Sequence, residues 1–303
     1  MRILIFLVTI LFALTPYKKL TFDSYISKLA FNDKYMIVAL EDSRVVVLKD
    51  QKPYFTIKLP KIHDFMGDPI PMPVYSLDIL KNQALILSQG EDQKREFYLL
   101  NLDTKKLTHI FTTKDTLMSA KFVDNDKIFF ALLSDEVELY SLKKGVIYKI
   151  QVGSYVFSKM AKYKNLAAIG DESGAVKIVD INKGKVIKVL RGFNKDKTIA
   201  LDIKKNLVLN GSSDKRVAIY TLDNYITTSF MAKFLPYAGS ISPKLDKFAI
   251  QYNEQNDIAL YSIYGKKLDI LKGHSMALND IYFYKKDEII SFSPAEILFW
   301  RVK

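Results

Sequence analysis

A motif of four residues recurs seven times along the chain and constrains the fold more than any other feature of the sequence. Its first and third positions are apolar in every copy, the alternation that buries one face of a β-strand. The last residues of successive copies are 52, 40, 39, 41, 41 and 39 positions apart. The copies occupy residues 45–48, 97–100, 137–140, 176–179, 217–220, 258–261 and 297–300. Such a period predicts an array of repeated structural units.

Further short apolar segments flank the copies and complete a unit of four strands. Residues 198–203 and 207–209 precede the fifth copy, and residues 186–190 follow the fourth. Polar turns such as 212–216 separate these segments, which are rich in residues that favour strands. Four strands in about 40 residues form one blade of a propeller. The sequence therefore predicts an all-β, seven-bladed β-propeller, and the repeat count argues against an eight-bladed ring.

The two ends of the repeat array predict how the ring closes. The seventh copy, 297–300, is not followed by a segment that could form a fourth strand. Residues 17–25 precede the first repeat and are otherwise unassigned. We expect them to supply the missing strand, since this leaves no exposed strand ladder at the seam.

The last repeat resembles the WD40 family. It begins with Gly273-His274 and ends in Trp300, which is similar to the Gly-His and Trp-Asp signature, although Arg301 stands where the Asp would be. The resemblance covers residues 17–303 and implies a seven-bladed propeller of the WD40 type. It also implies that His274 has a structural role and bonds within its own blade.

The other repeats follow the family pattern less closely. In WD40 repeats an Asp typically sits in the turn between the second and third strands. This chain has Asp at that place in two repeats and other residues in the rest: Asp42 and Asp214, against Lys94, Ser134, Ser173, Gln255 and Pro294. The period therefore supports the fold more strongly than the signature does.

The first residues read as an export signal. Arg2 is followed by an apolar run, 3–14, interrupted by Thr9, and Pro16 would end a helix there. Twelve residues are too few to span a membrane, which takes about 20, but they suit the apolar region of a signal peptide. We expect residues 1–16 to be a signal peptide, residues 17–303 to form the propeller and the protein to reside in the periplasm. An uncleaved anchor, which would be the only membrane contact, and a buried first strand are the alternatives.

The residues that usually carry catalysis or hold metals are sparse. The chain has no cysteine, which excludes disulfides, thiolate nucleophiles and Cys-based metal sites. Its three histidines, His63, His109 and His274, show no helical zinc spacing. Nucleophile-elbow, phosphate-loop and dinucleotide motifs are missing as well. We therefore expect no enzyme activity, no catalytic residue, no cofactor and no metal.

The charge balance is strongly basic, with a formal net charge of +12. The lysines are scattered and form no arginine-rich stripe or nucleic-acid motif. A basic surface can meet acidic proteins, anionic lipid or nucleic acid. We expect a solvated, lysine-rich surface and no nucleic-acid partner.

The spacing of 52 between the first two copies marks an insertion at residues 60–73, which contains four prolines. Proline stiffens a loop and favours extended segments. In the WD40 arrangement this loop would lie near the long turn 89–96 of the next blade. Loops on a rigid scaffold commonly carry binding function. The candidate partner-binding residues are His63, Asp64, Phe65, Met66, Asp68, Met72, Glu91, Asp92, Lys94 and Arg95.

Two other interpretations of the insertion remain open. It can be a surface insertion that the fold tolerates without a function. Alternatively, His63, Met66 and Met72 offer an imidazole and two thioethers, the soft ligands that suit copper.

The overall pattern favours a binding platform. Export signal, seven degenerate repeats and a lysine-rich, cysteine-free chain together resemble the periplasmic WD-repeat accessory proteins of periplasmic nitrate reductases (the NapL type). The resemblance implies a scaffold that assists maturation of, or electron delivery to, that reductase through its components, without a cofactor of its own. A scaffold in outer-membrane protein assembly and a small-ligand-binding propeller are the alternatives.

Overall fold

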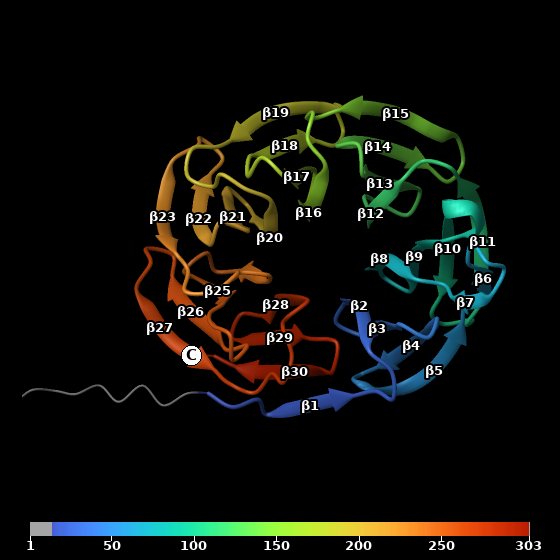
Figure 1. Ribbon diagram of the computed structural model, residues 1–303, viewed down its shortest axis with the longest axis horizontal. Coiled ribbons are helices and arrows are strands. Elements are labelled where there is room, and N and C mark those ends of the chain that lie inside the picture. The colour runs from blue at the N-terminus through green and yellow to red at the C-terminus, as the bar shows by residue number, and fades with distance from the viewer. Residues whose placement is uncertain (1–13, 303) are drawn as a thin grey trace, which may run out of the picture.

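In the computed structural model, which describes residues 14–302, seven four-stranded antiparallel sheets stand in a ring around a common axis (Figure 1). Within each sheet the four strands lie side by side, from an innermost strand at the axis to an outermost strand at the rim. The chain passes from the outermost strand of one blade to the innermost strand of the next. The predicted all-β, seven-bladed fold is confirmed. No helix of the described residues is long and apolar enough to cross a membrane.

In blades 1 to 3 the four strands follow one another along the chain from the axis outward. Blade 1 contains β2 (Ile26–Phe31), β3 (Tyr35–Leu40), β4 (Arg44–Lys49) and β5 (Lys52–Lys58). Blade 2 contains β8 (Val74–Leu80), β9 (Gln83–Gln89), β10 (Arg95–Asn101) and β11 (Leu107–Thr113), with the 3-10 helix η1 (Glu91–Gln93) between β9 and β10. Blade 3 contains β12 (Leu117–Phe122), β13 (Lys127–Leu132), β14 (Glu136–Ser141) and β15 (Gly145–Gln151).

Blades 4 to 7 follow the same order. Blade 4 contains β16 (Phe157–Tyr163), β17 (Leu166–Asp171), β18 (Val176–Asp180) and β19 (Lys185–Leu190). Blade 5 contains β20 (Thr198–Lys204), β21 (Leu207–Ser212), β22 (Arg216–Thr221) and β23 (Ile226–Met231). Blade 6 contains β24 (Gly239–Ile241), β25 (Lys247–Gln251), β26 (Ile258–Ser262) and β27 (Lys267–Leu271). Blade 7 contains β28 (Asp280–Lys285), β29 (Glu288–Phe292), β30 (Glu296–Arg301) and β1 (Lys18–Thr21).

The ring closes through β1, as the sequence predicted. This strand pairs antiparallel with β30, with Lys18 opposite Phe299 and Thr21 opposite Glu296. Figure 1 shows β1 as the outermost strand of blade 7. The export signal expected at residues 1–16 lies outside the described residues, except for its last three positions.

Burial in the repeated strands differs from the expected alternation. All five residues of β18 and all six of β3 are buried, not every second residue. The reason is that each sheet packs between two neighbouring sheets, which covers both of its faces. Alternation is retained in outer strands such as β1, where half-buried and exposed residues follow one another.

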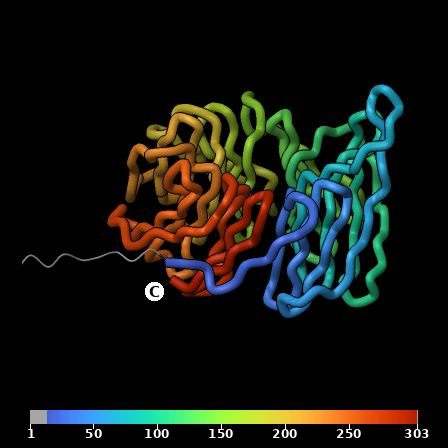
Figure 2. The backbone as a smooth tube through the Cα atoms, turned by 60° about the horizontal axis from the view of Figure 1, so that its bottom comes forward, coloured from blue at the N-terminus to red at the C-terminus, as the bar shows by residue number. Residues whose placement is uncertain are grey.

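A short two-stranded hairpin is inserted between blades 1 and 2. It consists of β6 (Lys61–His63) and β7 (Pro69–Pro71), which pair only with each other. Figure 2 shows it extending beyond the rest of the ring at one end of the molecule. The expected stiff loop is therefore a hairpin outside the seven blade sheets, anchored to the ring by the buried side chain of Ile62.

A buried polar network fixes blade 7. The indole Nε1 of Trp300 donates a 2.7 Å hydrogen bond to Ser291 Oγ, which lies 2.7 Å from Nε2 of His274. His274 Nδ1 lies 3.3 Å from Glu296, so the ring bonds within its own blade, as expected. The turn position that typically holds an Asp is occupied by Pro294 in this blade. The carboxylate that contacts His274 comes instead from Glu296.

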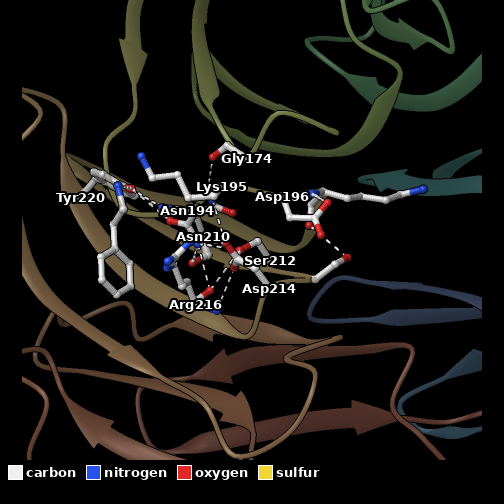
Figure 3. A network of polar contacts seen from close by, with 12 residues as sticks. Gly174, Asn194, Lys195, Asp196, Asn210, Ser212, Asp214, Arg216 and Tyr220 are labelled. Atoms are coloured by element: carbon white, nitrogen blue, oxygen red, sulfur yellow. Dashed lines mark hydrogen bonds and ion pairs between the residues drawn. The ribbon is translucent and has the colours of Figure 1, made fainter.

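Blade 5 has a similar network built from different residues (Figure 3). Asn194 occupies the place of the histidine, and Tyr220 occupies the place of the tryptophan. The Tyr220 hydroxyl donates to Asn194 Oδ1 at 3.0 Å, and Asn194 Nδ2 donates to Ser212 Oγ at 3.1 Å. Asp214 accepts from the backbone N–H of Arg216 at 3.0 Å. Neutral amide and phenol groups thus satisfy the same buried positions that imidazole and indole fill in blade 7.

Candidate functional site

The connections between blades and the turns between second and third strands emerge at one end of the ring, here called the upper face. This follows from the antiparallel order of four strands in each blade. The hairpin β6–β7 belongs to a blade-to-blade connection, and η1 belongs to a second-to-third strand turn. Both segments therefore lie on the upper face.

The tip of the hairpin is an ordered turn. Its ladder places His63 opposite Pro69, and the Asp64 N–H donates to the Asp68 carbonyl at 3.0 Å. Asp64 Oδ1 also accepts from the backbone N–H groups of Met66 at 2.8 Å and Asp68 at 3.0 Å. Gly67 adopts a φ of +89°, in the left-handed region that favours glycine. The turn is therefore held by its own hydrogen bonds.

Two large apolar side chains stand at this tip. Phe65 is 96% exposed and Met66 is 76% exposed. Phe65 exceeds every other large apolar side chain of the described residues in exposure. Aromatic residues presented in this way are typical anchors of protein interfaces, because binding removes their apolar surface from water.

The base of the hairpin is attached to blade 2. Glu91 accepts from the His63 backbone N–H at 3.0 Å, and its other oxygen lies 2.9 Å from His63 Nδ1. These hydrogen bonds, the backbone one first, lower the pKa of Glu91. Lys94 and Asp92 form an exposed ion pair of 3.2 Å in the same turn. The two segments expected to lie close together are therefore in direct contact.

Two of the candidate residues are buried and belong to the scaffold. Met72 is 3% exposed, and its sulfur accepts a hydrogen bond from Ser88 Oγ at 3.1 Å. Arg95 is 7% exposed, donates to the Leu117 carbonyl at 3.0 Å and lies over the Tyr75 ring. Met72 lies in the connection before β8 and Arg95 is the first residue of β10, and both side chains pack between neighbouring blades. Neither can contact a partner directly.

The structure offers no support for a copper site in the insertion. Met72 is engaged in the core, whereas Met66 is exposed at the tip, so their sulfurs do not share a site. Among residues 14–302, no group of three or more His, Asp or Glu side chains could hold a metal ion.

Further exposed apolar side chains lie on the upper face and were not singled out from the sequence. They come from blade-to-blade connections or the strand ends beside them: Tyr25, Tyr155, Val156, Met231 and Met276. Their exposed fractions run from 37% to 58%. Their shared position in the connections between repeats is the signal that could have identified them.

Comparisons with known proteins bear on the fold. No family model matches the chain, and no curated protein matches it. Among solved structures, the chain is similar to the computationally designed protein Ika8 in its crystal structure. The two are 15% identical, the match covers 96% of this chain and 99% of the designed one, and the TM-score is 0.69. At that identity the likeness shows the fold alone, which is an all-β propeller with seven blades in the described part of this chain.

Proposed function

We propose that this protein is an interaction scaffold that binds a partner protein on its upper face, with the hairpin β6–β7 as its main contact. The observation that supports this proposal most is the pair Phe65 and Met66, which are 96% and 76% exposed at the tip of an ordered turn. Ordering the turn before binding reduces the entropy lost on association. The additional apolar side chains on the same face would extend the contact across the ring.

The chemistry of the partner follows from the charge of the chain. A net charge of +12 favours acidic surfaces by long-range attraction. The first partners to test are components of periplasmic nitrate reductase, on the strength of the family resemblance seen in the sequence. The assignments to the WD40 family, to the periplasm and to a role without catalysis belong to this same proposal.

The test is quantitative capture of partners from the native cell envelope after crosslinking. The tagged wild-type protein is compared with the Phe65→Ala/Met66→Ala variant and with the control Tyr225→Ala/Tyr264→Ala. The control removes two aromatic side chains that are 73% and 82% exposed in turns between third and fourth strands, at the opposite end of the ring.

We expect the hairpin variant to lose at least ten-fold in recovery of its partner, while the control retains it. Reductase components among the proteins lost would support the finer assignment. Outer-membrane assembly components would favour the other scaffold role. Equal recovery by all three proteins would refute docking through the hairpin, and recovery of no protein at all would shift the proposal to a small-ligand-binding propeller.

A further inference from the structure

The upper end of the central channel contains a cavity of about 250 Å³. Its walls are the first residues of the innermost strands of blades 1 to 4 and of blade 7. A water molecule takes up about 30 Å³ in the liquid, so this space holds a small solute together with a few waters. It is smaller than the sites that accept drug-sized ligands.

The walls of this cavity carry more positive than negative charge. Three lysines line it, Lys28, Lys121 and Lys159, together with one carboxylate, Asp280. Lys121 is compensated, because its Nζ lies 3.3 Å from Asp78. Lys28 and Lys159 form no ion pair with any residue of the described chain. Two lysines from blades 1 and 4 therefore line one space, and neither has a carboxylate of the described residues within ion-pair distance.

The carboxylate of Asp280 offsets only part of this positive charge, because it is one negative group against Lys28 and Lys159 and forms an ion pair with neither. Its oxygens accept from the Ile281 N–H at 2.9 Å and from the Tyr282 hydroxyl at 3.1 Å. Burial lowers the pKa of Lys28, the nearby charge of Lys159 lowers it further, and Asp280 opposes both. The folded protein thus holds two like charges together in a partly buried space, an arrangement that an anion would relieve.

Serine side chains in the same walls can supply a further hydrogen-bond donor to an anion. Ser119 and Ser158 line the cavity beside the lysines. The Oγ of Ser158 is buried behind the cavity surface, so Ser119 offers the hydroxyl group that a ligand in the cavity can reach.

We propose that this cavity binds a small oxyanion of the phosphate or sulfate class, held by the ammonium groups of Lys28 and Lys159 and the hydroxyl group of Ser119. Charge-assisted hydrogen bonds from two lysines supply the affinity, and the narrow cavity limits the size of the ligand. The site is independent of the proposed docking hairpin, since none of its residues belongs to β6 or β7.

The test uses purified protein without any partner. Inorganic phosphate, sulfate and glycerol 3-phosphate are titrated by calorimetry at constant ionic strength, with chloride as the reference salt. The variant is Lys28→Gln/Lys159→Gln. The control, Lys143→Gln/Lys144→Gln, makes the same change in net charge at exposed lysines of the β14–β15 turn.

We expect saturable, one-to-one binding of phosphate or sulfate by the wild type, at least ten-fold weaker binding by the channel variant, and unchanged binding by the control. Binding of glycerol 3-phosphate as well would identify the terminal phosphate of a small ester as a ligand, whereas its exclusion would restrict the site to the free ion. The Phe65→Ala/Met66→Ala variant should bind the anion normally, which separates this test from that of the docking surface.

Thermal unfolding without added oxyanion provides a second readout. Removing two like charges that Asp280 offsets only in part should leave the melting temperature of the channel variant equal to or above that of the wild type. Absence of saturable binding in the wild type, or equal binding by the channel variant, would overturn the proposal. A lower melting temperature of the channel variant in chloride alone would also contradict it, because the lysines would then stabilise the fold without an anion.

Discussion

Lys19 forms an ion pair with Glu296 over a separation of 277 positions in the chain, with 3.0 Å between Nζ and Oε2. Lys19 lies on β1 and Glu296 begins β30, so the contact joins the first and last strands of the ring. Glu296 also accepts from the backbone N–H of Ser275 at 2.8 Å. The strand that closes the ring is therefore tied to the buried network of blade 7.

Deleting residues 1–21 should destabilise the propeller, because β30 then loses its outer neighbour and exposes an unpaired ladder. We expect a fall in melting temperature of about 5–10 °C, which corresponds to a few kcal/mol in a domain of this size. Deleting residues 1–13 leaves β1 in place and is the control. Similar melting temperatures of the two truncated proteins, measured by circular dichroism, would show that β1 does not hold the ring closed.

Replacing Ser291 with alanine should remove two hydrogen bonds at once. The indole of Trp300 and the imidazole of His274 both depend on its hydroxyl, and both are buried. We expect a loss of about 1–3 kcal/mol in the free energy of unfolding, measured in urea. Ser154→Ala, at an exposed position, should leave that free energy unchanged. A neutral result for Ser291→Ala would mean that water or a shifted side chain replaces the hydroxyl.

Stability should fall on acidification because of His274. Burial lowers the pKa of His274 from 6.5 to about 4, against the opposing effect of Glu296, so the folded protein favours the neutral ring. The unfolded chain therefore takes up a proton at higher pH than the folded one, and stability is lost as pH falls from about 6.5 to about 4.

Glu296 extends this loss to lower pH. Burial opposes its ionisation, but hydrogen bonds from Ser275 and Lys19 outweigh burial and lower its pKa to about 2. The contribution of Glu296 to stability is complete above pH 4.5 and disappears as pH falls toward 2.

Urea unfolding between pH 7 and 4 should show a flatter pH dependence for His274→Gln than for the wild type. Parallel curves for the two proteins would exclude His274 as the source.

Lys177 is buried between two aspartates from different blades. Its ammonium group contacts Asp171 and lies 3.2 Å from Asp135, and both carboxylates are fully buried. Burial raises the pKa of Asp135, although Lys177 opposes the shift. Lys177→Met leaves these carboxylates unpaired and should cost about 3–5 kcal/mol in chemical unfolding.

Two companion variants make the Lys177 experiment specific. Lys185→Met removes an exposed lysine and should have little effect. Adding Asp135→Asn and Asp171→Asn to Lys177→Met should recover part of the lost stability, because the buried charges disappear with the lysine. If the triple variant is no more stable than the single one, the loss arises from packing and not from unpaired charge.

The order of the hairpin tip can be tested without a partner. Asp64→Ala removes the acceptor of two backbone N–H groups in the turn, so the tip should open more often. We expect chymotrypsin to cleave after Phe65 several-fold faster in this variant, with an unchanged melting temperature. Asp223→Ala, at an exposed position in another turn, is the control. Unaltered cleavage would indicate that the ladder of β6 and β7 alone orders the tip.

The period of the sequence was sufficient to predict the seven blades and their closure. Each repeat carries its own apolar strands, so the number and order of the sheets follow from local pattern. The contact of the hairpin with η1 was also predictable, because blade-to-blade connections and second-to-third strand turns share a face. Phe65 and Met66 were placed correctly on an exposed insertion for the same reason.

The fate of individual side chains was less predictable. Met72 and Arg95 flank strand starts, and burial there depends on how closely the neighbouring blade approaches, which no local pattern reports. Asn194 replaces a histidine without any resemblance in sequence, since only its hydrogen-bonding capacity is retained. Lys28 and Lys159 line the same cavity because closure of the ring brings residues of blades 1 and 4 together around the axis.

The closure strand also determines how the molecule responds to tension. The chain enters β1 at Lys18, opposite Phe299, and leaves β30 at Arg301, so both ends depart from the same end of one antiparallel pair. A force that pulls these ends apart first breaks the backbone hydrogen bonds of Leu14 to Ile270 and Lys272, and then loads the β1–β30 pair one hydrogen bond at a time instead of shearing its whole ladder. The strand that closes the ring therefore also allows it to open, by stepwise unpairing of β1 from β30, when the two ends of the chain are pulled in opposite directions.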